Sequence, residues 1–292
     1  ATVVTMGVLS LPTMLKKGYS PEVSTGIISA SGTLGQIIPP SIVLVLLGSV
    51  LNISVGDLFI AALLPGFILV FLYFLWIIYN AIFKPKSVPA MPEEDLAEFI
   101  GAAKLKRIIT AFAIPFLLII AVLGSIFAGI ASPTEAAAIG AFGATMLTIF
   151  RGKFNISTLT EVMQKTTTLT SMAFTILVGA AAFGLVFRGM GGDRYLTEII
   201  VNAELGPHHF LAIVMVVIFI AGFFIDFIEI TFIIVPVVAP VFISLNIDLL
   251  WIGILIAINL QTSFLTPPFG FSLFYLKGVA PKSITTKHIY KG

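Results

Sequence analysis

Two long apolar stretches of this chain are interrupted by the same kind of short polar break. The breaks read Ser31-Gly-Thr-Leu-Gly-Gln-Ile-Ile-Pro-Pro-Ser41 and Gln261-Thr-Ser-Phe-Leu-Thr-Pro-Pro-Phe-Gly270. Each combines small and hydroxyl residues with a Pro-Pro pair. Because proline has no backbone N–H and its ring collides with the preceding turn, neither stretch can form one continuous helix.

A second proline keeps the same register in both stretches. Pro12 lies 27 residues before Pro39, and Pro240 lies 27 residues before Pro267, so the two copies are offset by 228 residues. Paired interruptions at corresponding positions of two halves are typical of the substrate and ion site of a secondary transporter, because broken helices supply polar backbone at membrane depth.

Composition places these two interrupted stretches in a lipid bilayer. Of the 292 residues, 58% are hydrophobic and only 10% are charged, which predicts an integral membrane protein. The apolar runs are long and do not alternate with polar residues, so they predict membrane-spanning helices and not barrel strands. The chain has no cysteine and hence no disulfide. It also has no basic tract, so we expect no nucleic-acid partner.

The positive charges predict the topology. Cytoplasmic loops carry excess Lys and Arg, and most of them fall on one side only if residues 208–245 form a re-entrant hairpin; Arg188 and Arg194 are the exceptions. The two copies then have opposite orientations. We expect apolar segments near 2–15, 22–50, 56–83, 107–129, 135–150, 161–187, 208–225, 230–245 and 249–277.

The predicted fold is therefore an all-α polytopic membrane protein. It contains an inverted repeat, and each copy consists of a re-entrant helical hairpin followed by a broken Pro-Pro helix. Residues 1–50 form the second hairpin limb and the broken helix of the first copy, and residues 208–292 form the second copy. Residues 51–207 supply scaffold and connecting helices with a cytoplasmic loop at 84–107.

The breaks also predict the ion ligands. Pro39 and Pro40 free two carbonyls of the first break, and Pro267 and Pro268 free two of the second. A dehydrated Na⁺ held by these oxygens and nearby hydroxyls would satisfy them in hydrocarbon. The predicted Na⁺ ligands are Ser29, Ser31, Gly32, Thr33, Gly35, Gln36, Thr262, Ser263 and Phe264. The alternative is a pair of proline kinks whose hydroxyls bond back to their own helix.

An anionic substrate is expected beside the cation. Each Pro-Pro pair starts a half-helix whose N-terminal end favours negative charge, which points to an organic acid. Acids inside a membrane are costly and usually functional, and Asp226 and Glu229 lie at the hairpin apex. One of them could merely cap the second limb; we expect Asp226 to be the site residue. The predicted substrate ligands are Ser41, Asp226, Thr266 and Gly270. Ser132-Pro-Thr-Glu135 predicts a capping box.

These motifs resemble a known family, the large membrane subunit of tripartite ATP-independent periplasmic (TRAP) transporters. The resemblance rests on Gly32–Ser41, Leu64-Pro-Gly66, Pro133–Ala138, the apex around Asp226, and Leu265–Gly270. It implies an elevator-type, Na⁺-coupled carrier in the bacterial inner membrane. It also implies a small membrane subunit and a periplasmic solute-binding protein that delivers an organic acid. Family members have further helices at both ends, so we expect the chain to be partial.

Other functions remain open at this point. The nearest alternative is a stand-alone Na⁺/carboxylate or anion symporter that needs no binding protein. A passive channel would not need matched inverted breaks. A membrane-embedded hydrolase would need a nucleophile and a base or a metal cluster, and the sequence offers neither a cysteine nor an HExxH motif. The sequence therefore favours a transporter over an enzyme.

Overall fold

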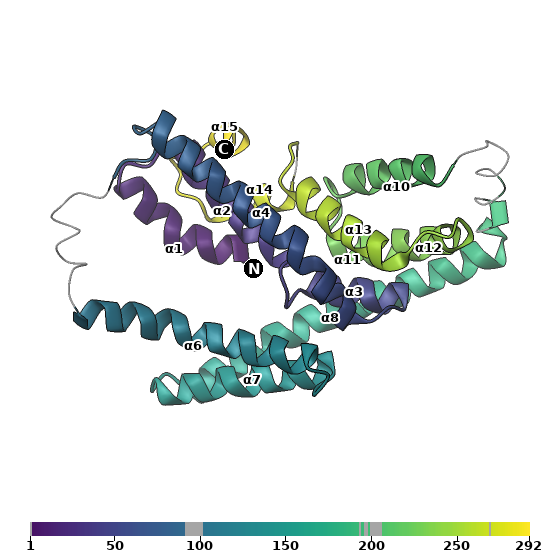
Figure 1. Cartoon of the computed structure of the whole chain (residues 1–292), viewed down its shortest axis with the longest axis horizontal. Coiled ribbons are helices and arrows are strands. Elements are labelled where there is room, and N and C mark those ends of the chain that lie inside the picture. Colours follow the sequence, from purple (N-terminus) through teal and green to yellow (C-terminus); the bar gives the residue numbers. More distant parts are fainter. Residues whose placement is uncertain (1, 91–101, 193, 196–197, 199–205, 269) are drawn as a thin grey trace. The chain divides into compact units, whose positions relative to one another are not determined.

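The computed structural model describes residues 2–90, 102–192, 194–195, 198, 206–268 and 270–292, and within these residues every regular element is a helix (Figure 1). The chain divides into two compact units. The first combines residues 1–89 with 176–292, and the second comprises residues 90–175. The all-helical prediction agrees with these elements. The division at residues 50 and 207 follows the repeat rather than compactness, and it stays a prediction.

The segment predicted as the first copy, a hairpin limb followed by the broken helix, opens the larger unit. Its elements are α1 (Thr2–Lys16), α2 (Pro21–Thr33), the short 3₁₀ helix η1 (Leu34–Gln36) and α3 (Ile42–Leu51). Ser20 accepts a hydrogen bond from the backbone N–H of Val23 and so caps α2, with Pro21 in the first turn, as expected of a helix start. The long apolar segment expected at 22–50 is thus divided at residues 34–41.

The segment predicted as the second copy contains more helical elements than the first. These elements are α10 (Pro207–Ala221), α11 (Phe227–Glu229), the π-helix η2 (Ile230–Ile234), α12 (Val235–Ser244), α13 (Leu249–Phe264) and α14 (Phe271–Val279), followed by α15 (Thr286–Lys291). The rings of Phe210, at the start of α10, and Phe242, near the end of α12, are 5.0 Å apart. The chain from 207 to 244 is therefore a helical hairpin whose open ends lie together.

The two broken helices pack on one another reciprocally. Limb α1 packs against α14, the half-helix of the other copy, and α12 packs against α3. In the same way α2 contacts α14 and α13 contacts α3 (Figure 1). One core cluster joins Val3, Leu11 and Ile28 of the first copy to Leu273 and Leu276 of the second, with Ile284 and Ile289 from the α15 region. Each half-helix is thus covered mainly by the other copy.

Helix α4 (Val55–Phe83) connects this core to the rest of the chain. One face of its first half, which carries Leu58, Phe59 and Ala62, is buried, and α4 packs against α3 and α13. Its second half exposes a run of large apolar side chains, among them Phe71, Phe74 and Trp76. By length and composition, three helices among the described residues could each cross a membrane: Val55–Phe83, Ile156–Gly189 and Phe227–Ser244. An apolar surface of this kind is stable in lipid and not in water.

The smaller unit is built on α6 (Ala102–Phe127) and α7 (Pro133–Phe150). A Cβ placed on Gly143 would lie 2.4 Å from Leu118 Cδ1, so the two helices approach closely at that point. The predicted capping box is confirmed: Ser132 and Glu135 each accept the other's backbone N–H at the start of α7. Residues 91–101 of the predicted polar connector at 84–107 lie outside the described residues.

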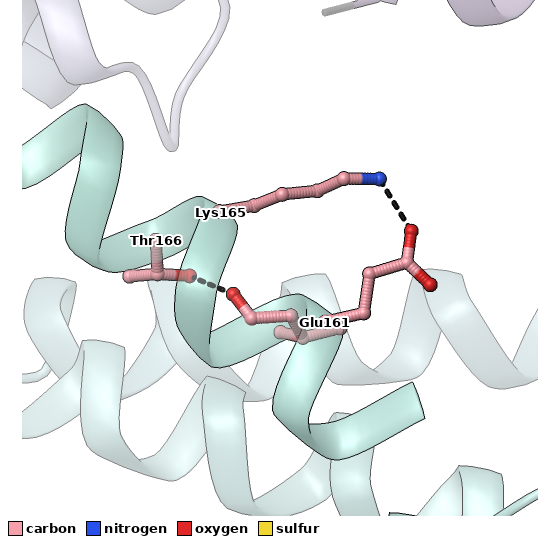
Figure 2. Close-up of polar contacts among 4 residues, drawn as sticks. Glu161, Lys165 and Thr166 are labelled. Atoms are coloured by element: carbon pink, nitrogen blue, oxygen red, sulfur yellow. Dashed lines mark hydrogen bonds and ion pairs between the residues drawn. The ribbon is translucent and has the colours of Figure 1, made fainter. Parts of the chain in front are cut away.

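Helix α8 (Ile156–Gly189) begins five residues before the predicted apolar segment. The apolar pattern did not include these first residues because most of them are polar. Lys165 Nζ lies 2.6 Å from Glu161 Oε1 in an exposed ion pair one turn apart, and the Thr166 hydroxyl bonds back to the Val162 carbonyl (Figure 2). Exposed pairs of this kind contribute little to stability. Their presence marks this end of α8 as its more polar end.

Candidate functional site

In both breaks, a serine hydroxyl donates to a carbonyl that proline leaves without its helical N–H partner. Pro40 and Pro268 cannot donate to the carbonyls four residues earlier, which belong to Gln36 and Phe264. In the structure the Ser41 hydroxyl donates to the Gln36 carbonyl, and the Ser272 hydroxyl donates to the Phe264 carbonyl at 3.1 Å. Both Pro-Pro bonds are cis. Each carbonyl lies four residues before the second proline of its own break, and each accepts a hydrogen bond from a serine at the start of the half-helix that follows.

These hydrogen bonds qualify the prediction of free carbonyls. A carbonyl oxygen has two lone pairs, so the serine bond leaves one for an ion at Gln36 and one at Phe264. The Ser263 carbonyl also has a donor, the Thr266 N–H at 3.1 Å. Gly35 lies exposed in η1. The role of these four carbonyls as Na⁺ ligands stays a prediction.

Most of the predicted hydroxyl ligands bond back to their own helices. The Ser31 hydroxyl donates to the Ile27 carbonyl at 2.6 Å, and Thr33, Thr262, Ser263 and Thr266 donate similarly to carbonyls three or four residues earlier. Such bonds occupy the hydrogen and leave the oxygen lone pairs available. The alternative interpretation, back-bonded hydroxyls at proline breaks, therefore describes how these side chains are held.

Three of the predicted site residues, Ser41, Gly32 and Gly270, also have a structural role in the breaks. Ser41 accepts the Leu44 N–H at 3.3 Å and so caps α3. Gly32 packs against the backbone of Val3, where a Cβ would lie 2.9 Å from Val3 Cα. Gly270 has φ +36°, and a Cβ there would lie 2.8 Å from the Phe264 carbonyl oxygen. Only glycine can close the second break in this conformation.

Buried side-chain oxygens without partners gather on these elements. Among the described residues, the buried side-chain N and O atoms without a hydrogen-bond partner are all oxygens, those of Ser24, Ser29, Gln36, Glu229, Thr231 and Gln261. A buried acceptor left unpaired costs about 1–3 kcal/mol, and oxygens are the ligands that hard cations prefer. Ser29 and Gln36 belong to the predicted Na⁺ set.

Sequence reasoning missed four of these oxygens, those of Ser24, Glu229, Thr231 and Gln261. Gln261 was visible as the first letter of the second break motif. Glu229 was interpreted as a possible cap, and Thr231 follows it by two residues. Glu229 and Thr231 flank Ile230, the first residue of the π-helix η2, and such irregular turns are frequent at functional sites.

The residue that caps the second limb at the hairpin apex differs from the one we expected. Asp226 is the N-cap of α11, and its Oδ1 accepts the Phe227 N–H at 2.7 Å. Glu229 instead carries a buried oxygen without a partner. The cap is therefore Asp226 and not Glu229, because the chain enters the limb directly at residue 227. The role of Asp226 in substrate binding stays a prediction.

The apex packs directly on the second break. A Cβ placed on Gly222 would lie 2.2 Å from the Ser263 hydroxyl oxygen. The rings of Phe227 and Phe264 are 6.4 Å apart, and those of Phe264 and Phe271 are 5.6 Å apart. Asn259 anchors the first limb, donating from Nδ2 to the Met215 carbonyl at 2.7 Å. The hairpin and the end of α13 thus form one packed assembly.

Comparison with known proteins places this architecture in a family. All of residues 1–292 match the family model described as "Tripartite ATP-independent periplasmic transporter, DctM component". The C4-dicarboxylate TRAP transporter large permease protein DctM of Pseudomonas aeruginosa is 32% identical over 280 residues, which cover 96% of this chain and 64% of that protein. The protein of the same name from Vibrio cholerae is 32% identical over 305 residues (97% and 66%).

A relative named for another solute is equally similar. The ectoine TRAP transporter large permease protein TeaC of Halomonas elongata is 32% identical over 276 residues, covering 94% of this chain and 62% of that protein. The chain thus spans a little under two thirds of the length of these relatives. The match over every residue confirms the family predicted from the break motifs: the chain belongs to the DctM family of large membrane permease components of TRAP transporters.

Proposed function

We propose that this chain forms the ion- and substrate-binding part of a Na⁺-coupled organic-acid carrier in the bacterial inner membrane. The observation that carries the proposal is the set of buried, unpartnered oxygens on elements that belong to, or pack on, the two broken helices. Membrane helices normally leave no polar atom unsatisfied in hydrocarbon, so a bound cation is a natural partner for these oxygens. Family membership supports transport over the enzymatic alternative.

An inverted repeat with alternating access fits the packing. Each half-helix contacts the limb of the other copy, as two copies related by a pseudo-two-fold axis would. The hairpin's open ends meet at Phe210 and Phe242, so it would enter and leave the membrane on the same side. We propose that the two broken helices and this hairpin move together as the mobile element of an elevator.

The proposed ligands are those predicted from sequence. Na⁺ would bind oxygens contributed by residues 29–36 and 262–264, and substrate would bind near Ser41, Asp226, Thr266 and Gly270. The contact of Gly222 with Ser263 supports a common site, since it brings the apex that carries Asp226 onto the end of α13. The positive ends of α3 and α14 would favour the carboxylate of the solute.

We further propose that the chain works with a small membrane subunit and a periplasmic binding protein that delivers the solute. The relatives are named for C4-dicarboxylates and for ectoine, so membership of the family does not select one solute. A stand-alone symporter is the competing function. The two differ in whether transport needs the binding protein.

Reconstitution tests both parts of the proposal. The complete transporter containing this chain is placed in proteoliposomes, and uptake of labelled solute is measured with a Na⁺ gradient or a proton gradient imposed separately. We expect uptake only with the Na⁺ gradient and only when loaded binding protein is present. Equal uptake with a proton gradient in the absence of Na⁺ would refute Na⁺ coupling. Uptake of free solute without the binding protein would favour the stand-alone symporter.

A further inference from the structure

Gln261 is a buried amide with only one end occupied. It lies on α13 just before the second break, and its side chain is 2% exposed. Its Nε2 donates to the Tyr73 hydroxyl oxygen at 3.1 Å, across to helix α4. Its Oε1 is buried and has no donor among the described residues. A polar atom in this situation requires a partner that the described side chains do not provide.

The contact with Tyr73 determines what Gln261 can offer. Because the Tyr73 hydroxyl accepts a hydrogen of the amide nitrogen, the amide is oriented with its oxygen turned away from that hydroxyl. What it presents to the interior is an acceptor. An acceptor cannot hydrogen-bond a carboxylate, so the free end of Gln261 suits a cation better than the anionic solute.

The first break brings a matching group to the same elements. Helix η1, which carries Gln36, packs against both α13 and α4, and Gln36 Oε1 is likewise buried without a partner. Each break therefore contributes one neutral amide oxygen to a region where α4, α13 and η1 meet. Amide oxygens are ordinary ligands of hard cations, and they add no charge that the bilayer would penalise.

We propose that Gln261 supplies a side-chain oxygen to the bound Na⁺ and that Tyr73 is a positioning residue that holds this oxygen in place. The proposal rests on the Na⁺ coupling argued above and adds two residues to that site. It also gives α4 a part in ion binding, because the hydroxyl that orients the amide comes from that helix.

Thermal stabilisation of the purified protein measures the binding without transport. A ligand that binds only the folded state raises the melting temperature with its concentration, so unfolding is followed in detergent while NaCl replaces KCl at constant ionic strength. Gln261→Met keeps the side-chain volume and removes the oxygen. Gln261→Glu keeps an oxygen and adds charge, and Tyr73→Phe removes only the orienting hydroxyl.

The expected results differ in direction. Gln261→Met should raise the Na⁺ concentration for half-maximal stabilisation by about tenfold or more, which corresponds to ~1.4 kcal/mol or more. Tyr73→Phe should raise it less. Gln261→Glu should leave it unchanged or lower it, since the Tyr73 hydroxyl can donate to a carboxylate. The matched control is Asn259→Leu, which removes an amide on the same helix whose nitrogen bonds to α10. It should lower the melting temperature and leave the Na⁺ dependence unchanged.

Several outcomes would overturn the proposal. Wild-type protein without any Na⁺-specific stabilisation would refute Na⁺ binding itself, and the inference with it. Wild-type stabilisation with an unchanged Gln261→Met variant would refute the role of Gln261 alone. A Gln261→Glu variant as impaired as Gln261→Met would mean that the amide NH₂ group, and not the oxygen, is required. If Gln261→Met does not fold, the other two variants still decide the question. An unchanged half-maximal Na⁺ concentration in Tyr73→Phe, or a raised one in Gln261→Glu, would refute the proposal.

Discussion

The contact between the hairpin apex and the second break gives a sharp steric prediction for Gly222→Ala. Gly222 has φ −65°, so alanine fits the backbone without strain. The new Cβ would lie 2.2 Å from Ser263 Oγ and 2.8 Å from Ser263 Cβ. Ordinary contact between carbon atoms is ~3.5–4.0 Å, so the apex must move from α13 by roughly 1 Å. Overpacking of this kind costs about 1–3 kcal/mol.

Unfolding of the purified protein in a lipid-like detergent measures this cost. The matched control is Gly184→Ala in α8, where a Cβ meets no atom within 4 Å, and its stability should change by less than ~0.5 kcal/mol. Ser263→Gly removes both colliding atoms. The stability lost through Gly222→Ala should therefore be much smaller in the Ser263→Gly background than in the wild-type protein. The packing argument fails if Gly222→Ala is as stable as Gly184→Ala, or if the double variant shows no recovery.

Three further predictions concern the site and the topology. Ser272→Ala removes the buried hydrogen bond from the Ser272 hydroxyl to the Phe264 carbonyl. Because that carbonyl loses its donor, the free energy of unfolding should fall by about 1–3 kcal/mol in the same assay, and an unchanged stability would contradict this. Asp226→Asn should reduce Na⁺-driven uptake by about tenfold or more, whereas Glu135→Gln should keep most activity since glutamine completes a capping box; the reverse pattern would show that the site is misassigned. Cysteines at His208 and Ser244 should both react with an impermeant thiol reagent from the same side of the membrane, and labelling from opposite sides would exclude the re-entrant hairpin.

Features fixed by local backbone chemistry were predictable from sequence. The Pro-Pro pairs located both breaks, and α13 ends at Phe264 just before the second of them. The spacing of Ser132 and Glu135 located a capping box that the structure confirms. In each case the residues that determine the geometry lie within a few positions of one another. Proline and capping residues act over that range, so their effect can be read without knowing the fold.

Side-chain partners set by tertiary packing were not predictable. Gln261 and Tyr73 are separated by 188 residues, and the sequence around either residue does not predict their hydrogen bond. The exchange of capping roles between Asp226 and Glu229 depends on which residue enters the helix first, a boundary that sequence locates only to within a few residues. The unpartnered oxygens emerged only when the neighbours of each buried side chain were known.

The reciprocal packing of the two broken helices also constrains how the protein is made. Helices α1 and α2 are covered by α14 and α15, and the Thr25 hydroxyl bonds to a carbonyl 263 residues later, that of His288. At about 5–20 residues per second, the ribosome needs roughly ten seconds or more to deliver these partners. The first break is therefore synthesised before the helices that cover it, and the core can close only after the second broken helix has been made.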